Sequence, residues 1–251
     1  GVAVTLLLLL AAPAVGWFPD AERVARAAAE ANRAAGRDQP LEIDVEVGLA
    51  GPGRGATPEG APERPTASPE PLGRGTLWAD PAGRARLELF HREGFRERHL
   101  LHEGVREAAR DGQPLEDPLP LLPPLAPLQA GRGAELLIWL ASQGAPRDAE
   151  LAPAGLHDAV VLGTRRHGAA LWVAQEGWQL VRIDTREGAH FHLGPEREFG
   201  DVRLPAWIAI EAPGQPELRM TLRAVRSAAA SDAAFSRAWL RESVSVPPGS
   251  A

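Results

Sequence analysis

Strict alternation of apolar and polar residues marks one segment of the chain as a β-strand. Between Leu41 and Leu49 every odd position is apolar, and the even positions carry two glutamates, an aspartate and a glycine. A period of two places all the apolar side chains on one face of a strand. We therefore predict a strand over 41–49 with one buried face and one face in water.

The same alternation recurs further along the chain. A short strand through Trp78, a turn over 80–83 and a second strand over 85–89 predict a hairpin. Residues 95–103 favour another strand, and 156–226 contain strand patterns separated by glycine turns. Because no parallel crossover pattern interrupts them, these strands predict an antiparallel meander.

Two segments have helical patterns. Asp20 can cap a helix whose small apolar residues recur every three or four positions until Gly36. Residues 134–143 form a shorter helix that is apolar on every side. A helix of that kind needs partners on two faces, so we expect it to be enclosed by other elements.

Two further segments favour irregular structure. Residues 50–73 are rich in Pro, Gly, Ala and Thr, and they bury too little apolar surface to offset their ordering entropy. We expect a flexible hairpin loop there and a disordered tail at 243–251. The segment 114–128 interleaves six prolines with leucines, which excludes a regular helix or a central strand, yet it is too apolar to lie free in water.

The first residues resemble an export signal. Residues 2–12 form an apolar run of about ten residues, whereas a membrane-spanning helix needs about 20. Ala12-Pro13-Ala14 matches a small-residue cleavage pattern, so we interpret 1–16 as the remnant of a signal peptide. A buried N-terminal segment is the alternative. Since the sequence has no cysteine for a lipid anchor, we expect a periplasmic protein.

Composition narrows the class of protein. With 251 residues, 44% hydrophobic and 24% charged, the chain is typical of a globular protein, and we expect one domain over 17–242. The formal net charge of -6 and the scattered arginines give no basic surface for nucleic acid. We expect a monomer.

Catalytic and metal-binding patterns are weak. His190 and His192 share a strand face and His99 and His102 are three apart, but no third ligand accompanies either pair. The sequence has no G-x-S-x-G or S-x-x-K pattern, and its Gly131-Arg132-Gly133 lacks the lysine of a phosphate loop. We therefore expect neither an enzyme nor a metal or other cofactor.

Large apolar side chains in the predicted strands and the short helix are the remaining candidates for function. A tryptophan can bury ~150 to 250 Å², and these elements carry more apolar surface than two small helices can cover. They suggest an apolar cavity, although filling a core is the ordinary role of such residues. The candidate cavity residues are Trp78, Leu87, Leu136, Trp139, Leu140, Trp172, Trp178 and Trp207.

Several short motifs together resemble the LolA/LolB-type family of lipoprotein-sorting carriers. The order of elements is similar over most of residues 17–240, although each motif alone is of low specificity. The motifs are a G-x-L-W strand before a proline turn (75–78 and Pro81), a pair of strands (170–173 and 180–183), a strand containing proline (199–208), and a late D-x-x-F (232–235).

The resemblance implies a fold and a function. The fold would be α+β: a strongly curved antiparallel sheet, or half-barrel, with an N-terminal helix and a short lid helix over an apolar concave face, and 114–143 would be the proline-rich lid region. In the family an arginine just before the proline turn holds the lid shut. Here that position is Asp80, so the latch does not carry over, and Arg74 or Arg86 would contact the lid or a headgroup instead.

The resulting hypothesis is a periplasmic carrier that binds acyl chains of lipoproteins or lipids for transfer towards the outer membrane. An inner-membrane transporter or an outer-membrane receptor would be its partner. A lipid-sensing or lipoprotein-sensing regulatory module on the same fold is one alternative, and an enzyme with an unrecognised site is another.

Overall fold

The structure is a computed structural model that describes residues 20–32, 39–50, 71–154, 157–165, 168–229 and 232–242. The predicted signal segment, most of the 50–73 loop and the 243–251 tail lie outside the described residues.

An open antiparallel sheet of 13 strands dominates the molecule. Its order is β6-β5-β4-β3-β2-β1-β15-β14-β11-β10-β9-β8-β7, and β12 and β13 form a separate two-stranded sheet. The strands are β1 (Leu41–Leu49), β2 (Gly73–Ala79), β3 (Ala85–His91), β4 (Arg96–His102), β5 (Val105–Arg110), β6 (Gln113–Pro114), β7 (Ala149–Ala154), β8 (His157–Gly163), β9 (Ala170–Ala174), β10 (Leu180–Asp184), β11 (His190–Leu193), β12 (Glu196–Phe199), β13 (Val202–Pro205), β14 (Trp207–Glu211) and β15 (Leu218–Ser227).

Short helices accompany the sheet. The Asp20 side chain caps the first of them by accepting a hydrogen bond from the backbone N–H of Glu22 at 2.8 Å. Pro127 lies in the first turn of the second, where a proline does not interrupt helical hydrogen bonds. The helices are α1 (Ala21–Ala31), α2 (Ala126–Gln129), α3 (Gly133–Ser142), the 3-10 turn η1 (Asp232–Phe235) and α4 (Arg237–Arg241).

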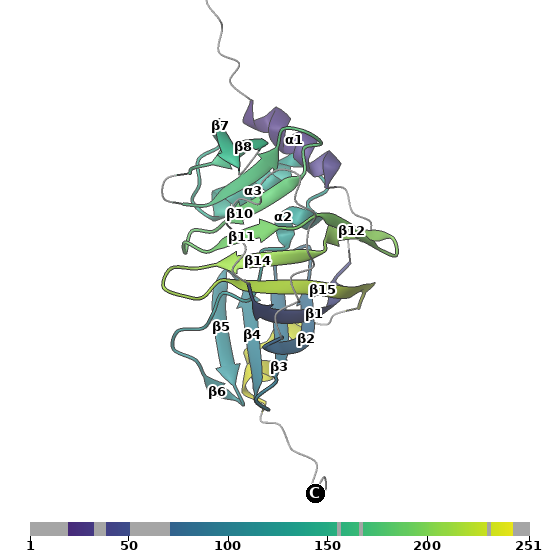
Figure 1. Ribbon diagram of the computed structural model, residues 1–251, viewed down its shortest axis with the longest axis vertical. Coiled ribbons are helices and arrows are strands. Elements are labelled where there is room, and N and C mark those ends of the chain that lie inside the picture. The colour runs from purple at the N-terminus through teal and green to yellow at the C-terminus, as the bar shows by residue number, and fades with distance from the viewer. Residues whose placement is uncertain are drawn as a thin grey trace, which may run out of the picture.

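The two faces of the main sheet have different neighbours. In Figure 1, β14 and β15 run nearly horizontally while β4 and β5 run vertically, so the sheet turns as it is crossed, and α2 and α3 lie behind β10 and β11. We call the face that packs against α1, α2 and α3 the inner face and the opposite one the outer face. The odd-numbered residues of β1 from Leu41 to Val47 lie on the inner face, as their alternating burial shows, whereas Leu49 at its end is exposed.

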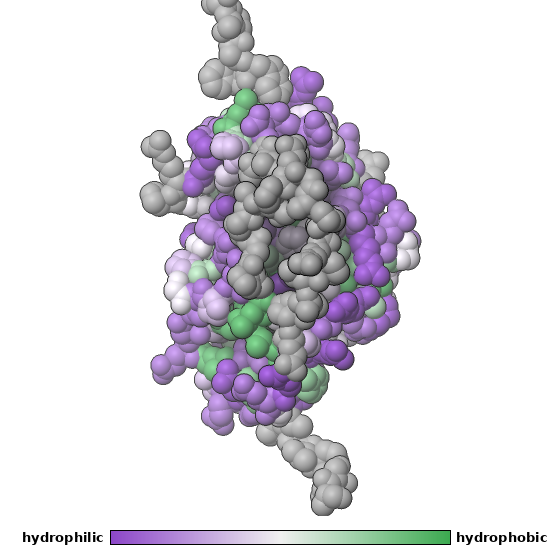
Figure 2. All heavy atoms as spheres, in the orientation of Figure 1, coloured by the Kyte–Doolittle hydropathy of each residue, from purple (hydrophilic) through white to green (hydrophobic). Residues whose placement is uncertain are grey.

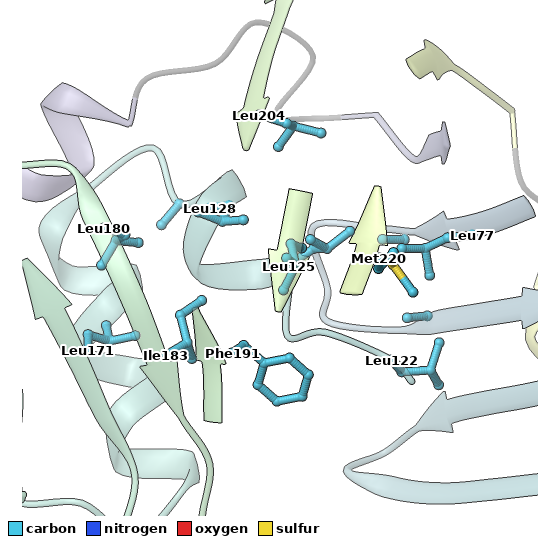
Figure 3. Packing of buried hydrophobic residues seen from close by; sticks show 14 of the residues in the cluster. Leu77, Leu122, Leu125, Leu128, Leu171, Leu180, Ile183, Phe191, Leu204 and Met220 are labelled. Atoms are coloured by element: carbon cyan, nitrogen blue, oxygen red, sulfur yellow. The ribbon is translucent and has the colours of Figure 1, made fainter. Parts of the chain in front are cut away.

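One apolar core occupies the inner face. It joins alanines and Val24 of α1, the leucines of α3 and inward-facing residues of strands β1 to β3, β8 to β11, β14 and β15. Figure 3 shows Leu122 and Leu125, both just before α2, among side chains from these strands, including Phe191, Leu77 and Met220. The inner face is therefore filled by side chains from the chain itself.

The C-terminal segment covers part of the outer face. Phe235 and Leu240 are buried against Leu100 and Ala109, and Trp78 and Trp239 pack on the same cluster. Arg86 donates a hydrogen bond to the Ala234 carbonyl at 3.0 Å, and its guanidinium lies over the rings of both tryptophans. This end of the outer face is thus enclosed.

Most of the predicted elements are confirmed. The 41–49 strand has the predicted bounds, the hairpin begins earlier, at Gly73, and the α+β class with an open antiparallel sheet is observed. The exclusion of helix from 114–128 is wrong for its last residues, because α2 begins at Ala126. The turn η1 and helix α4 were not predicted.

Candidate ligand-binding cavity at the lid region

Residues 114–143, which we call the lid region after the role that the family resemblance predicts, place leucines in the core of the inner face. Leu121, Leu122, Leu125 and Leu128 are between 1% and 5% exposed, and all four belong to the main core. Prolines between them prevent a long helix, so this stretch crosses the sheet as irregular chain and one helical turn. The lid leucines, as we call these four, thus cover apolar strands that α1 and α3 do not reach.

One arginine holds this stretch to the sheet. Arg106 of β5 donates a hydrogen bond from Nη1 to the Leu122 carbonyl oxygen at 2.7 Å. Burial lowers the pKa of the Arg106 guanidinium, and the charge of Glu187 opposes this. Among the described residues no carboxylate forms an ion pair with Arg106. Its charge is therefore compensated mainly through the lid backbone.

A cavity opens where the lid region meets the rim of the sheet. It has a volume of about 1130 Å³, and we call it the rim cavity. The turns β2–β3, β4–β5 and β10–β11 form one side, and residues 123–132 with the outward side of α3 form the other. Trp139 is half-buried there, and Ile138 and Val105 are exposed at 63% and 49%. The cavity thus combines apolar walls with the charged residues of the turns.

Gln129, the last residue of α2, lines this cavity with an unusual side chain. The residue is 5% exposed, and neither Nε2 nor Oε1 has a hydrogen-bond partner among the described residues. Most buried polar groups in native proteins are hydrogen-bonded, so an unpaired amide requires a specific reason.

The start of α3 borders the same cavity. Glu135 accepts hydrogen bonds from the backbone N–H groups of Gly131 and Arg132, at 2.6 and 3.3 Å. It also forms an ion pair with the Arg132 side chain at 2.9 Å. Partial burial would raise the pKa of Glu135, but these hydrogen bonds hold it below its usual range. Glu135 is therefore occupied in fixing the turn between α2 and α3.

Five of the eight candidate cavity residues lie together. Leu87, Leu136 and Leu140 are fully buried in the main core, and Trp139 and Trp178 pack against it. Of these five, Trp139 also lines the rim cavity. Trp178 lies in the β9–β10 turn, where its carbonyl accepts a hydrogen bond from Asn32.

The other three tryptophans are placed on the outer face, which corrects the expectation of one shared apolar face. Trp78 packs under the C-terminal segment, and Trp172 donates a hydrogen bond to Asp184 at 2.7 Å within a small separate cluster. Trp207 lies beneath Arg219, whose guanidinium carbon is 4.2 Å from the ring centroid. Each occupies the strand position next to an inward-facing residue, and successive side chains of a strand alternate between faces.

The expected lid contacts of Arg74 and Arg86 are also corrected. Arg74 is exposed beside Glu46 at 3.8 Å, and Arg86 is engaged by the C-terminal segment on the outer face. Asp80, which stands where the family has its arginine, is buried and forms an ion pair with Arg84 at 2.6 Å. The lid contact made by Arg106 was missed, because β5 has no regular apolar alternation and its arginine looks like an ordinary surface residue.

The inner face also holds a charged cluster on β3, β4 and β5. Glu97 is 2% exposed and contacts His99 Nε2 at 2.7 Å, Arg110 Nη2 at 3.1 Å and His91 Nε2 at 3.5 Å. Burial would raise the pKa of Glu97, but its hydrogen bonds with His99 and Arg110 outweigh burial and lower it. Burial lowers the pKa of His91. Glu97 is thus held by an ion pair with Arg110 and a hydrogen bond with His99.

Histidines and carboxylates do not assemble into a metal site in the part of the chain that the structure describes. His190 Nδ1 contacts Asp184 at 2.8 Å and His192 Nε2 contacts Glu211 at 3.1 Å, so both are engaged in pairs on the sheet. Among the described residues, no helix is both long enough and apolar enough to cross a bilayer.

Comparisons with known proteins find distant structural likenesses and no sequence match. No protein-family model matches the chain, and no curated protein matches its sequence. A solved LolA superfamily protein from Nitrosomonas europaea is similar over 88% of this chain and 100% of its own, with 13% identity and a TM-score of 0.48. A DUF1329 family protein from Desulfovibrio piger is similar over 88% and 97%, with 8% identity and a TM-score of 0.48.

The structure of MucB is similar over 86% of this chain and 62% of its own, with 12% identity and a TM-score of 0.26. The LolA superfamily, to which the sequence motifs point, is thus among the structural matches, at a TM-score below 0.5.

Proposed function

We propose that the chain is a carrier whose inner face takes up acyl chains of lipids or lipoproteins when the lid leucines move away. The observation that carries this proposal is that four leucines of an irregular, proline-rich stretch fill the centre of an apolar sheet face. They lie where an acyl chain would lie, and regular secondary structure holds only Leu128 among them, in the single turn α2.

The energetics set the kind of ligand that can replace them. Exposing a buried leucine costs about 1.5–3 kcal/mol, and burying one methylene of a ligand returns about 0.8 kcal/mol. About two to four methylenes therefore offset each leucine that leaves. An acyl chain of roughly sixteen carbons can replace all four on this basis, whereas a chain of eight carbons is too short.

The rim cavity provides the entrance in this proposal. Exposed Val105 and Ile138 give a chain an apolar path. Figure 2 shows a mainly hydrophilic surface with smaller apolar groups. Arg106 would hold the lid region shut until a ligand competes, since its hydrogen bond to Leu122 must break for the lid leucines to move. The residues proposed to contact the chain are Leu87, Leu136, Trp139, Leu140 and Trp178.

The proposal includes a periplasmic location and partners at both membranes. The apolar run of residues 2–12 and the Ala12-Pro13-Ala14 pattern support export to the periplasm. There a carrier of acyl chains would receive its cargo at the inner membrane and deliver it to an acceptor towards the outer membrane. We propose no catalytic step, since binding and release suffice for transfer.

Native mass spectrometry of protein purified without detergent tests the proposal. We expect an adduct that organic solvent removes, and uptake of a fluorescent sixteen-carbon fatty acid by the stripped protein. An eight-carbon analogue is the matched control and should bind far more weakly. A clean apo mass together with no uptake of the long-chain probe would refute the carrier.

Transfer separates a carrier from a lipid sensor on the same fold. A carrier loaded with the fluorescent fatty acid should release it to acceptor vesicles at a rate that depends on vesicle concentration. A loaded protein that keeps its ligand in the presence of excess vesicles would instead favour the sensing module.

A further inference from the structure

The unpaired side chain of Gln129 is the feature of the rim cavity that the acyl-chain proposal leaves unexplained. Removing an amide from water without a new hydrogen bond destabilises a fold, so a leucine or methionine would suit this position better in a protein with no ligand. Gln129 is buried to 95%, lines a cavity and has both polar side-chain atoms free among the described residues. Such a group fits a ligand that completes its hydrogen bonds.

Gln129 lies where the apolar core of the inner face meets the rim cavity. It follows Leu128, which is in the main core, and shares the cavity wall with Trp139 and Thr185. An acyl chain that replaces the lid leucines leaves its polar end in the rim cavity. The first polar group attached to the chain would therefore meet Gln129.

The chemistry of a carboxamide limits which polar groups can satisfy it. Nε2 donates and Oε1 accepts, so both atoms are satisfied only by a ligand group that offers an acceptor and a donor together. A carboxylate, an ester or a phosphodiester offers acceptors alone and would leave Oε1 unpaired. A secondary amide offers a carbonyl oxygen and an N–H, and it satisfies both.

The charges around the cavity are also compatible with a neutral group. Its lining contains four arginines and four carboxylates, so no excess of positive charge selects an anion. Arg84 is paired with Asp80 and Arg132 with Glu135, which uses two of the arginines. The lining as a whole therefore has no net charge, which is compatible with an uncharged amide at Gln129.

We propose that Gln129 is a specificity-determining residue, which binds the amide that joins an acyl chain to the rest of the ligand and selects amide-linked over ester-linked chains. This inference rests on the proposed function.

Two probes that differ only in having an amide N–H or an ester oxygen test this selectivity. N-palmitoylglycine methyl ester carries the amide, and its analogue O-palmitoylglycolic acid methyl ester has oxygen in place of the N–H. We expect the wild-type protein to bind the first about tenfold more tightly, the effect of about one hydrogen bond that is otherwise left unmade. Displacement of a bound fluorescent fatty acid measures both affinities.

Variants test whether Gln129 causes the preference for the amide probe over the ester probe. In Gln129→Met the ratio of the two affinities should fall to about one, through weaker binding of the amide probe. Gln143→Met changes the other glutamine of the rim cavity, which is only half-buried, and should keep the wild-type ratio. Gln129→Met should unfold at the same or a higher temperature than wild type, because it removes an unpaired buried amide.

The outcomes distinguish the two proposals. Equal binding of both probes by the wild type, or an unchanged ratio in Gln129→Met, would overturn the role of Gln129 and leave the carrier intact. Failure to bind either probe or the fatty acid would overturn the carrier and this inference together. The comparison in the wild type requires no variant, so it does not depend on how Gln129→Met folds.

Discussion

A disulfide that fixes α2 to the sheet rim should block ligand uptake if the lid leucines have to move. A Cβ placed on Gly83, in the β2–β3 turn, would lie 3.9 Å from the Cβ of Ala126. Disulfide-bonded cysteines have Cβ atoms about 3.5–4.5 Å apart, so the pair Gly83→Cys and Ala126→Cys has suitable spacing. The sequence contains no cysteine, so no other thiol competes.

The effect of this bond on stability can be worked out. It closes a loop of about 43 residues, which corresponds to about 4 kcal/mol of stabilisation in the chain-entropy description. Gly83 has φ of +84°, and a side chain there costs about 1–2 kcal/mol. We therefore expect the oxidised variant to be about 2–3 kcal/mol more stable than wild type, and the reduced one about 1–2 kcal/mol less stable.

Uptake of the fluorescent sixteen-carbon fatty acid is the assay. The oxidised double variant should take up little ligand, and reduction should restore uptake to the wild-type level. The single variants Gly83→Cys and Ala126→Cys control for the substitutions themselves. Full uptake by protein whose disulfide is completely formed would refute movement of α2 as the opening step.

Three further predictions follow from the site. Arg106→Met removes a charge-assisted hydrogen bond of about 1.5–3 kcal/mol to the lid backbone, so stopped-flow fluorescence should show faster uptake; a slower rate would contradict a latch. The pKa of His91 is lowered, so the unfolded chain binds its proton first as pH falls below 6.5. His91→Gln should accordingly lose less stability than wild type in chemical unfolding from pH 6.5 to 5, and equal losses would exclude His91 as the cause. Trp139→Ala should weaken ligand binding, whereas Trp172→Ala, on the outer face, should lower the unfolding temperature and leave binding unchanged; reduced binding in the second variant would reverse our assignment of faces.

The sequence allowed prediction of those elements whose burial pattern is regular. The 41–49 strand alternates between core and partly exposed residues up to Val47, so its bounds were predictable, although Leu49 at its end is exposed. The tryptophans were harder to place, because both faces of the sheet are partly covered. Trp172 lies between Leu171 and Val173, and all three are buried, so hydrophobicity alone does not tell which face each side chain occupies.

The candidate site was only partly predictable for a related reason. The proline-rich composition of 114–128 indicated an irregular apolar stretch over the sheet, and the structure confirms that it packs there. The contact between Arg106 and Leu122 joins a strand residue to a backbone carbonyl, and a carbonyl has no signature in the sequence. The position of Gln129 likewise depends on how α2 meets three turns from distant parts of the chain.

The strand order has a consequence for how the protein folds. Strands β1 to β6 form one block of neighbouring strands, and β7 to β11 with β14 and β15 form the other. β1 and β15 join the blocks along the register from Leu41↔Ser227 to Leu49↔Leu218. Pairing within each block is local, whereas this ladder must close a loop of about 180 residues. Each block can therefore form early, with closure of the ladder as the slow step. The lid region is the covalent link between the blocks, and its leucines share one core with strands of both.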